Sequence, residues 1–128
     1  MIRTLSYFNL LFAVLYFLGY LQNSGAFVIS GLLAVIVFNW MALRSLENEQ
    51  FQWTVFHWAA AILTLSFAAF TGYTATTLLL DVVEYRYYPA PAITLISCGF
   101  IFTLAILFHL YLTLAKSIRK KSDQLFDN

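Results

Sequence analysis

The sequence predicts an all-α integral membrane protein in which four transmembrane helices form an antiparallel up-and-down bundle. Composition is the first observation: the chain of 128 residues is 62% hydrophobic and only 10% charged, whereas soluble domains carry about 25% charged residues. The second is that the charges fall in a few clusters separated by long uncharged stretches. A bilayer core of about 30 Å takes roughly 20 helical residues, so each stretch is long enough for one or two crossings.

The first uncharged stretch, residues 4–43, is twice the length of one crossing and contains the turn-forming sequence Gln22-Asn23-Ser24-Gly25. Glycine and the short polar residues favour turns, and they divide the stretch in the middle. The stretch therefore predicts two helices, at about residues 5–21 and 26–43.

Two more helices are predicted at about residues 52–80 and 92–116. The first of these is longer than one perpendicular crossing requires, so it must tilt, protrude or break near Gly72. The second follows Tyr88-Pro89-Ala90-Pro91, where proline ends one helix and suits the first turn of the next. We expect residues 1–128 to form a single four-helix transmembrane domain with a short basic cytoplasmic tail.

The distribution of basic residues predicts the orientation. With four crossings, both termini and the loop after Arg44 lie on one side of the membrane. The basic residues on that side are Arg3, Arg44, Lys116, Arg119, Lys120 and Lys121, and the other side holds only Arg86. Because Lys and Arg concentrate in cytoplasmic segments, we expect both termini in the cytoplasm. The default location for a chain this compact is a bacterial inner membrane.

Several classes of protein are excluded by simple counts. A net charge of +1 and a single Cys argue against a nucleic-acid partner and a disulfide-stabilised secreted domain. No phosphate loop, CxxC, HExxH or GxSxG motif is present. Ser66 and Ser97 lie far from the two histidines along the predicted helices, so no nucleophile pairs with a base. We therefore do not expect an enzyme.

Four polar residues are predicted to share a depth near the cytoplasmic side: Asn9, Asn39, His57 and His109. One interpretation is a buried hydrogen-bond layer in which His, Asn and Ser or Thr side chains satisfy one another. A second is a pH-responsive or pore-lining role. A third is ligation of a b-type haem by His57 and His109. No other cofactor is expected, and no metal site, because the histidines lack nearby carboxylates.

Small residues predict which helix faces pack together. In the helix predicted at about residues 52–80, small residues follow His57 at helical spacing: Ala61, Thr64, Ala68 and Gly72. In the helix predicted at about residues 92–116, the corresponding face before His109 carries Cys98 and Ala105. In lipid, small residues are where helix backbones approach. We expect an antiparallel register that pairs His57 with His109, Ala61 with Ala105, Ala68 with Cys98, and Gly72 with Thr94.

Three functional hypotheses follow. The first is a non-enzymatic, homo-oligomeric membrane protein acting as a pore, a membrane-perturbing effector or the membrane-embedded component of a larger system. The second is a haem-binding redox subunit that uses His57 and His109. The third is an accessory or assembly subunit of a larger membrane complex. The expected partners are the lipid bilayer and either further copies of the chain or another membrane protein.

At the outer end, Asp81, Glu84 and Arg86 are either a ligand vestibule or solvated residues that end a helix.

Overall fold

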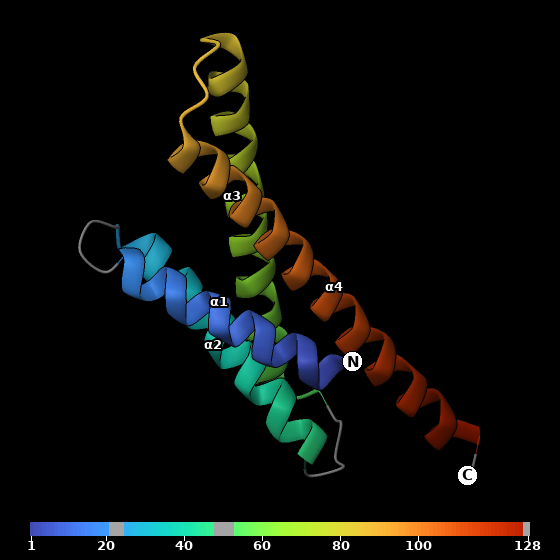
Figure 1. Ribbon diagram of the computed structural model, residues 1–128. Coiled ribbons are helices and arrows are strands. Elements are labelled where there is room, and N and C mark those ends of the chain that lie inside the picture. The colour runs from blue at the N-terminus through green and yellow to red at the C-terminus, as the bar shows by residue number, and fades with distance from the viewer. Residues whose placement is uncertain (21–24, 48–52, 127–128) are drawn as a thin grey trace.

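A computed structural model describes residues 1–20, 25–47 and 53–126, without the side chains of residues 16–20, 120–121 and 123–126. It contains four helices in the order α1 (Ile2–Tyr20), α2 (Ala26–Glu47), α3 (Val55–Glu84) and α4 (Ala90–Phe126) (Figure 1). The prediction of an all-α, antiparallel four-helix bundle is confirmed. The predicted turn at residues 22–24 and the predicted helix ends at Leu21 and Gln52 lie outside the described residues.

The helix ends have local causes. Thr54 caps α3 with an extended backbone, φ −85° and ψ 169°. At its other end α3 continues past residue 80 to Glu84, and the Tyr85 N–H then donates to the Asp81 carbonyl. Arg86 adopts φ 49°, in the left-handed region that often follows a helix. Pro89 precedes α4, as expected for a residue that lacks a backbone donor.

The helices form two hairpins of unequal length. α1 lies against α2, α2 against α3, α3 against α4, and α1 also contacts α4. Figure 1 shows the α3–α4 hairpin continuing well past the end of the α1–α2 hairpin. At 1.5 Å per residue, the 30-residue α3 is about 45 Å long and the 22-residue α2 about 33 Å long. We call the end with the N-terminus the basal end, and the end with the α3–α4 connection the distal end.

The core lies where all four helices meet. Its buried residues are Ala13, Leu32, Val35, Phe67, Ala68, Phe102 and Ile106. Small side chains on α1 and α3 make room there for two phenylalanine rings. A Cβ atom on Gly31 of α2 would overlap the ring of Phe67, so α2 and α3 approach each other closely because residue 31 has no side chain.

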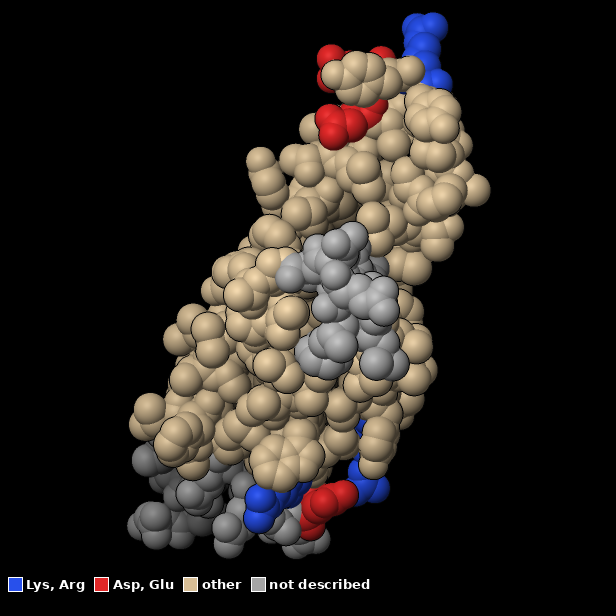
Figure 2. Space-filling model, turned by 90° about the vertical axis from the view of Figure 1, so that its left-hand side faces the viewer, with Lys and Arg blue, Asp and Glu red and all other residues tan. Residues whose placement is uncertain are grey.

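Three helices are long and apolar enough to cross a membrane: α2, α3 and the segment Ala90–Arg119 of α4. The apolar part of α1 whose side chains the structure describes, Ile2–Leu15, is shorter. On the face shown in Figure 2, charged side chains gather at the two ends of the molecule and leave an uncharged belt between them. The chain is thus a multi-pass membrane protein with three candidate spans, and the fourth predicted crossing rests on the shorter α1.

Candidate functional site

Buried polar side chains of α1, α2 and α4 lie near the basal end. They are at most 1% exposed and belong to Ser6, Asn9, Asn39, His109 and Thr113. We call this group the basal cluster. The Oγ of Ser6 lies 2.7 Å from Nε2 of His109, and the Phe38 ring of α2 meets the same imidazole edge-on at 5.6 Å between centroids. The His109 side chain therefore points toward α1 and α2.

The two asparagines of the basal cluster are each partly satisfied. Asn9 Nδ2 donates to the Ala105 carbonyl of α4 at 3.4 Å, and Asn39 Nδ2 donates to the Val35 carbonyl of its own helix at 2.7 Å. Their side-chain oxygens and Nδ1 of His109 are buried with no hydrogen-bond partner among the described residues. The cluster ties α1 to α4 through two polar contacts, Ser6 with His109 and Asn9 with the Ala105 carbonyl.

His57 lies in a different environment. Its Nδ1 accepts a hydrogen bond from the Thr54 N–H at 3.3 Å and is 2.8 Å from the Thr54 hydroxyl. Since Nδ1 is the acceptor, Nε2 of a neutral imidazole carries the hydrogen and donates it to Ser45 Oγ at 3.0 Å. His57 thus ties the first turn of α3 to the last turns of α2.

The structure does not bring the two histidines into one site. Among the described residues, a chain of ring contacts separates the two imidazoles: Phe38 lies against His109, Trp53 against Phe38, and His57 against Trp53. Each Nε2 atom is hydrogen-bonded to a different serine. This arrangement does not fit ligation of one haem by both rings. Within residues 1–20, 25–47 and 53–126, no three His, Cys, Asp or Glu side chains gather where they could hold a metal ion.

Two serine–histidine pairs that sequence reasoning missed raise the question of nucleophilic catalysis. The 2.7 Å between Ser6 and His109 matches a nucleophile and its base. Both side chains are 0% exposed, so a substrate has no access to the Ser6 oxygen. In the other pair, His57 donates to Ser45 and so has no lone pair free on Nε2 to accept its proton. Helical spacing could have indicated Ser6, because it lies one turn before Asn9.

The predicted register between α3 and α4 is wrong. A Cβ atom on Gly72 would lie 3.3 Å from Thr103 Cγ2, whereas the sequence paired Gly72 with Thr94. A Cβ on Gly99 would lie 3.1 Å from Ala75, and the hydroxyls of Thr71 and Thr103 are 2.9 Å apart. Moving from Thr94 to Thr103 shifts the register by about 13 Å at 1.5 Å per residue, so the expected pairing of His57 with His109 is lost as well.

The shift arises because α3 contacts different helices along its length. Thr64 donates to the Ala34 carbonyl of α2 at 3.3 Å, and Ala61 packs in a cluster with Phe38 of α2. Ala68 lies in the central core, and Gly72 lies against α4. On α4, Cys98 and Ala105 are half-buried, and the Ala105 carbonyl faces α1 through Asn9. The predicted packing face of α3 therefore contacts both α2 and α4, and that of α4 contacts α1 as well as α3.

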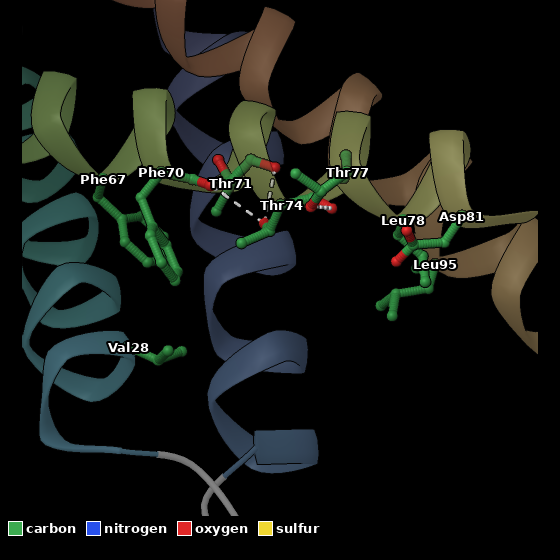
Figure 3. A pocket seen from close by; sticks show the side chains of 11 residues that line it. Val28, Phe67, Phe70, Thr71, Thr74, Thr77, Leu78, Asp81 and Leu95 are labelled. Carbon is green, nitrogen blue, oxygen red and sulfur yellow. Dashed lines mark hydrogen bonds between the residues drawn. The ribbon is translucent and has the colours of Figure 1, made fainter.

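Among the residues that the structure describes, two hollows open on the surface of the spanning helices. The first, which we call the notch, is about 110 Å³ and lies between α2 and α3 among Phe27, Ser30, Gly31, Ala34, Leu63, Ser66 and Phe67. The second, which we call the distal groove, is about 390 Å³ and lies where α3 and α4 pass the beginning of α2. Figure 3 shows the distal groove with phenylalanines toward one end and Asp81 at the other.

No family model, curated protein sequence or solved structure matches this chain.

Proposed function

We propose that the protein is a non-enzymatic, multi-pass component of a membrane assembly, built from copies of this chain that associate through the notch. In this proposal α1 also crosses the bilayer, since its 19 residues make a helix of about 28 Å that runs antiparallel to α2. The basal end faces the cytoplasm, because Arg3, Arg44, Lys116 and Arg119 lie there and Arg86 lies at the distal end.

The observation that carries the proposal is the composition of the notch. Four of its residues are small, namely Ser30, Gly31, Ala34 and Ser66. Within a bilayer no hydrophobic force brings helices together, and small residues spaced by four, such as Ser30 and Ala34, let a second helix approach closely. The notch therefore supports a helix–helix contact more than a contact with a soluble partner.

The notch also has projecting side chains beside it. Leu33 is 47% exposed and Leu63 is 59% exposed, and both flank the small residues. A two-fold symmetric contact needs a hollow and a matching projection on the same patch, because each copy presents the same surface to the other. This favours a second copy of the chain as the occupant.

Other functions have weaker support. A pore lined by the basal cluster would need those side chains to face a lumen, yet they lie inside the packed bundle. Haem binding by His57 and His109 would need both Nε2 atoms to leave their serine partners.

The test is the stoichiometry of the protein in liposomes, counted by single-molecule photobleaching over a range of protein-to-lipid ratios. We expect the wild-type chain to associate, and Ser30→Leu or Ser66→Leu, which fill the notch, to shift it to monomers. The matched control is Ser97→Leu, the same change at an exposed position of α4 outside both hollows. A wild-type chain that stays monomeric at every ratio would refute the proposal.

A further inference from the structure

The distal groove differs from the notch because a row of polar side chains from α3 lines it among apolar residues. Thr71, Thr74, Thr77 and Asp81 follow one another on α3 and line the groove. The remaining lining is apolar or lacks polar side-chain atoms: Val28, Phe67, Phe70, Ala75, Leu78, Leu95 and Gly99. The phenylalanines thus lie toward the core, Asp81 lies at the distal end beside Leu78 and Leu95, and the threonines lie along α3 between them.

Each of the three threonine hydroxyls lies within hydrogen-bond distance of a backbone carbonyl of α3 to which it can donate. Thr71 donates to the Ala68 carbonyl at 3.0 Å, Thr74 to the Phe70 carbonyl at 3.1 Å, and Thr77 to the Thr74 carbonyl at 3.0 Å. A hydroxyl has one proton and two lone pairs, so each oxygen retains only acceptor capacity. The Thr71 and Thr103 hydroxyls are 2.9 Å apart and either can be the donor, and in both cases the Thr71 proton is bonded within the protein.

Asp81 adds a fourth acceptor with a negative charge. Figure 3 shows its carboxylate turned along α3 toward Leu78, above Leu95, and not away from the groove. Every polar side chain in the described lining is therefore an acceptor, and the charge lies at the distal end. Thr74 and Asp81 are exposed, and a ligand complementary to this lining brings hydrogen-bond donors and a positive charge to the distal end and apolar surface toward the phenylalanines.

We infer that the distal groove binds an amphipathic primary ammonium ion, with the ammonium group at Asp81 and Thr77 and the hydrocarbon chain along Phe67, Phe70 and Leu95. An ammonium group has three N–H donors and no acceptor, which is complementary to this lining. The volume of about 390 Å³ falls within the range of small-ligand pockets. The same chemistry occurs in a free alkylamine and in the ethanolamine headgroup of a lipid. The inference goes beyond the proposed function and does not require self-association.

The test uses the full chain in phosphatidylcholine nanodiscs, titrated with octylammonium and followed by isothermal calorimetry. The heat of partitioning into empty nanodiscs is subtracted. We expect a saturable heat for the wild type, and a loss of about 10- to 100-fold in affinity in Asp81→Asn, because hydrogen bonds to charged groups contribute about 1.5–3 kcal/mol. Thr77→Val should weaken binding to a smaller extent.

Two variants are matched controls. Glu84→Gln removes an exposed carboxylate one turn beyond Asp81 and outside the groove. Thr76→Val removes a hydroxyl that donates to the Gly72 carbonyl and does not line the groove. Both should bind octylammonium like the wild type. Octanol and octyltrimethylammonium, which lack the charge or the N–H donors, should bind at least about tenfold more weakly.

A second arm distinguishes the two sources of the ammonium group. Native mass spectrometry after graded delipidation compares retained phosphatidylethanolamine with retained phosphatidylcholine in wild type and Asp81→Asn. Selective, Asp81-dependent retention of phosphatidylethanolamine supports a lipid occupant, and calorimetric binding without such retention supports a free amine. The inference is overturned if octylammonium gives no saturable heat, if Asp81→Asn binds it unchanged, or if octanol or octyltrimethylammonium binds equally well.

Discussion

Ser6 on α1 and His109 on α4 are 103 positions apart in the sequence, yet Ser6 Oγ lies 2.7 Å from His109 Nε2 with both side chains fully buried. The other ring nitrogen, Nδ1, has no partner among the described residues. Ser6 therefore supplies the side-chain hydrogen bond of the His109 imidazole, and this contact joins α1 to α4.

Ser6→Ala should destabilise the bundle by about 1–3 kcal/mol, because it leaves a buried ring nitrogen unsatisfied. Unfolding in mixed micelles with increasing SDS measures the change. A double-mutant cycle with His109→Phe should give a coupling of about 0.6–1.7 kcal/mol, the range for hydrogen bonds between membrane helices. Thr4→Ala, at an exposed position of α1, is the control and should be close to neutral. A coupling of zero would show that the contact does not stabilise the fold.

Gly31→Ala should destabilise the packing of α2 on α3 by about 1–3 kcal/mol, because its methyl group would overlap the Phe67 ring. Gly25→Ala is the matched control, since a Cβ there has nothing within 4 Å. The same SDS titration measures both variants. Phe67→Leu should partly rescue Gly31→Ala by making room for the methyl group, and equal stability of the two glycine variants would contradict the close approach.

The register of α3 against α4 can be tested by disulfide trapping in Cys98→Ala protein. Ala75→Cys combined with Gly99→Cys should cross-link rapidly, because a Cβ at position 99 lies 3.1 Å from that of Ala75 and disulfides join Cβ atoms about 3.5–4.5 Å apart. Mass spectrometry of proteolytic peptides identifies the bond. The comparison is Ala68→Cys with native Cys98, the pair predicted from sequence, and faster cross-linking of that pair would contradict the structure.

Thr54→Ala should loosen the first turn of α3 and cost about 1 kcal/mol, the usual effect of losing an N-cap side chain. The Thr54 hydroxyl is 2.8 Å from His57 Nδ1, so its loss also removes one of the two Thr54 contacts that hold the imidazole against Ser45. Hydrogen exchange of the amides that begin α3 should accelerate. The control is Thr76→Ala in the same helix, whose hydroxyl donates to the Gly72 carbonyl. Unchanged exchange in Thr54→Ala would show that the cap does not hold this turn.

The number and direction of the helices can be predicted from the amino-acid sequence alone. The length of the uncharged stretches and the prolines near residue 90 are enough to predict four antiparallel helices, because hydrocarbon thickness sets how many apolar residues a crossing needs. The burial of Asn9, Asn39 and His109 inside the bundle is consistent with the high free energy of exposing polar groups to lipid. Length predicts a crossing for α2, α3 and α4, whereas the described apolar part of α1 is shorter than these spans.

The rotation and register of the helices were decided by the tertiary structure. Spacing placed His57 and His109 on matching faces, yet one imidazole is hydrogen-bonded to Ser45 and the other to Ser6. The reason is that side-chain volumes must fit at every helix contact at once. The Phe67 ring fits only over Gly31, and Thr64 reaches α2 at the Ala34 carbonyl. These constraints turn α3 toward α2 at the basal end and leave α4 to pack on α1, which no pattern within one helix can reveal.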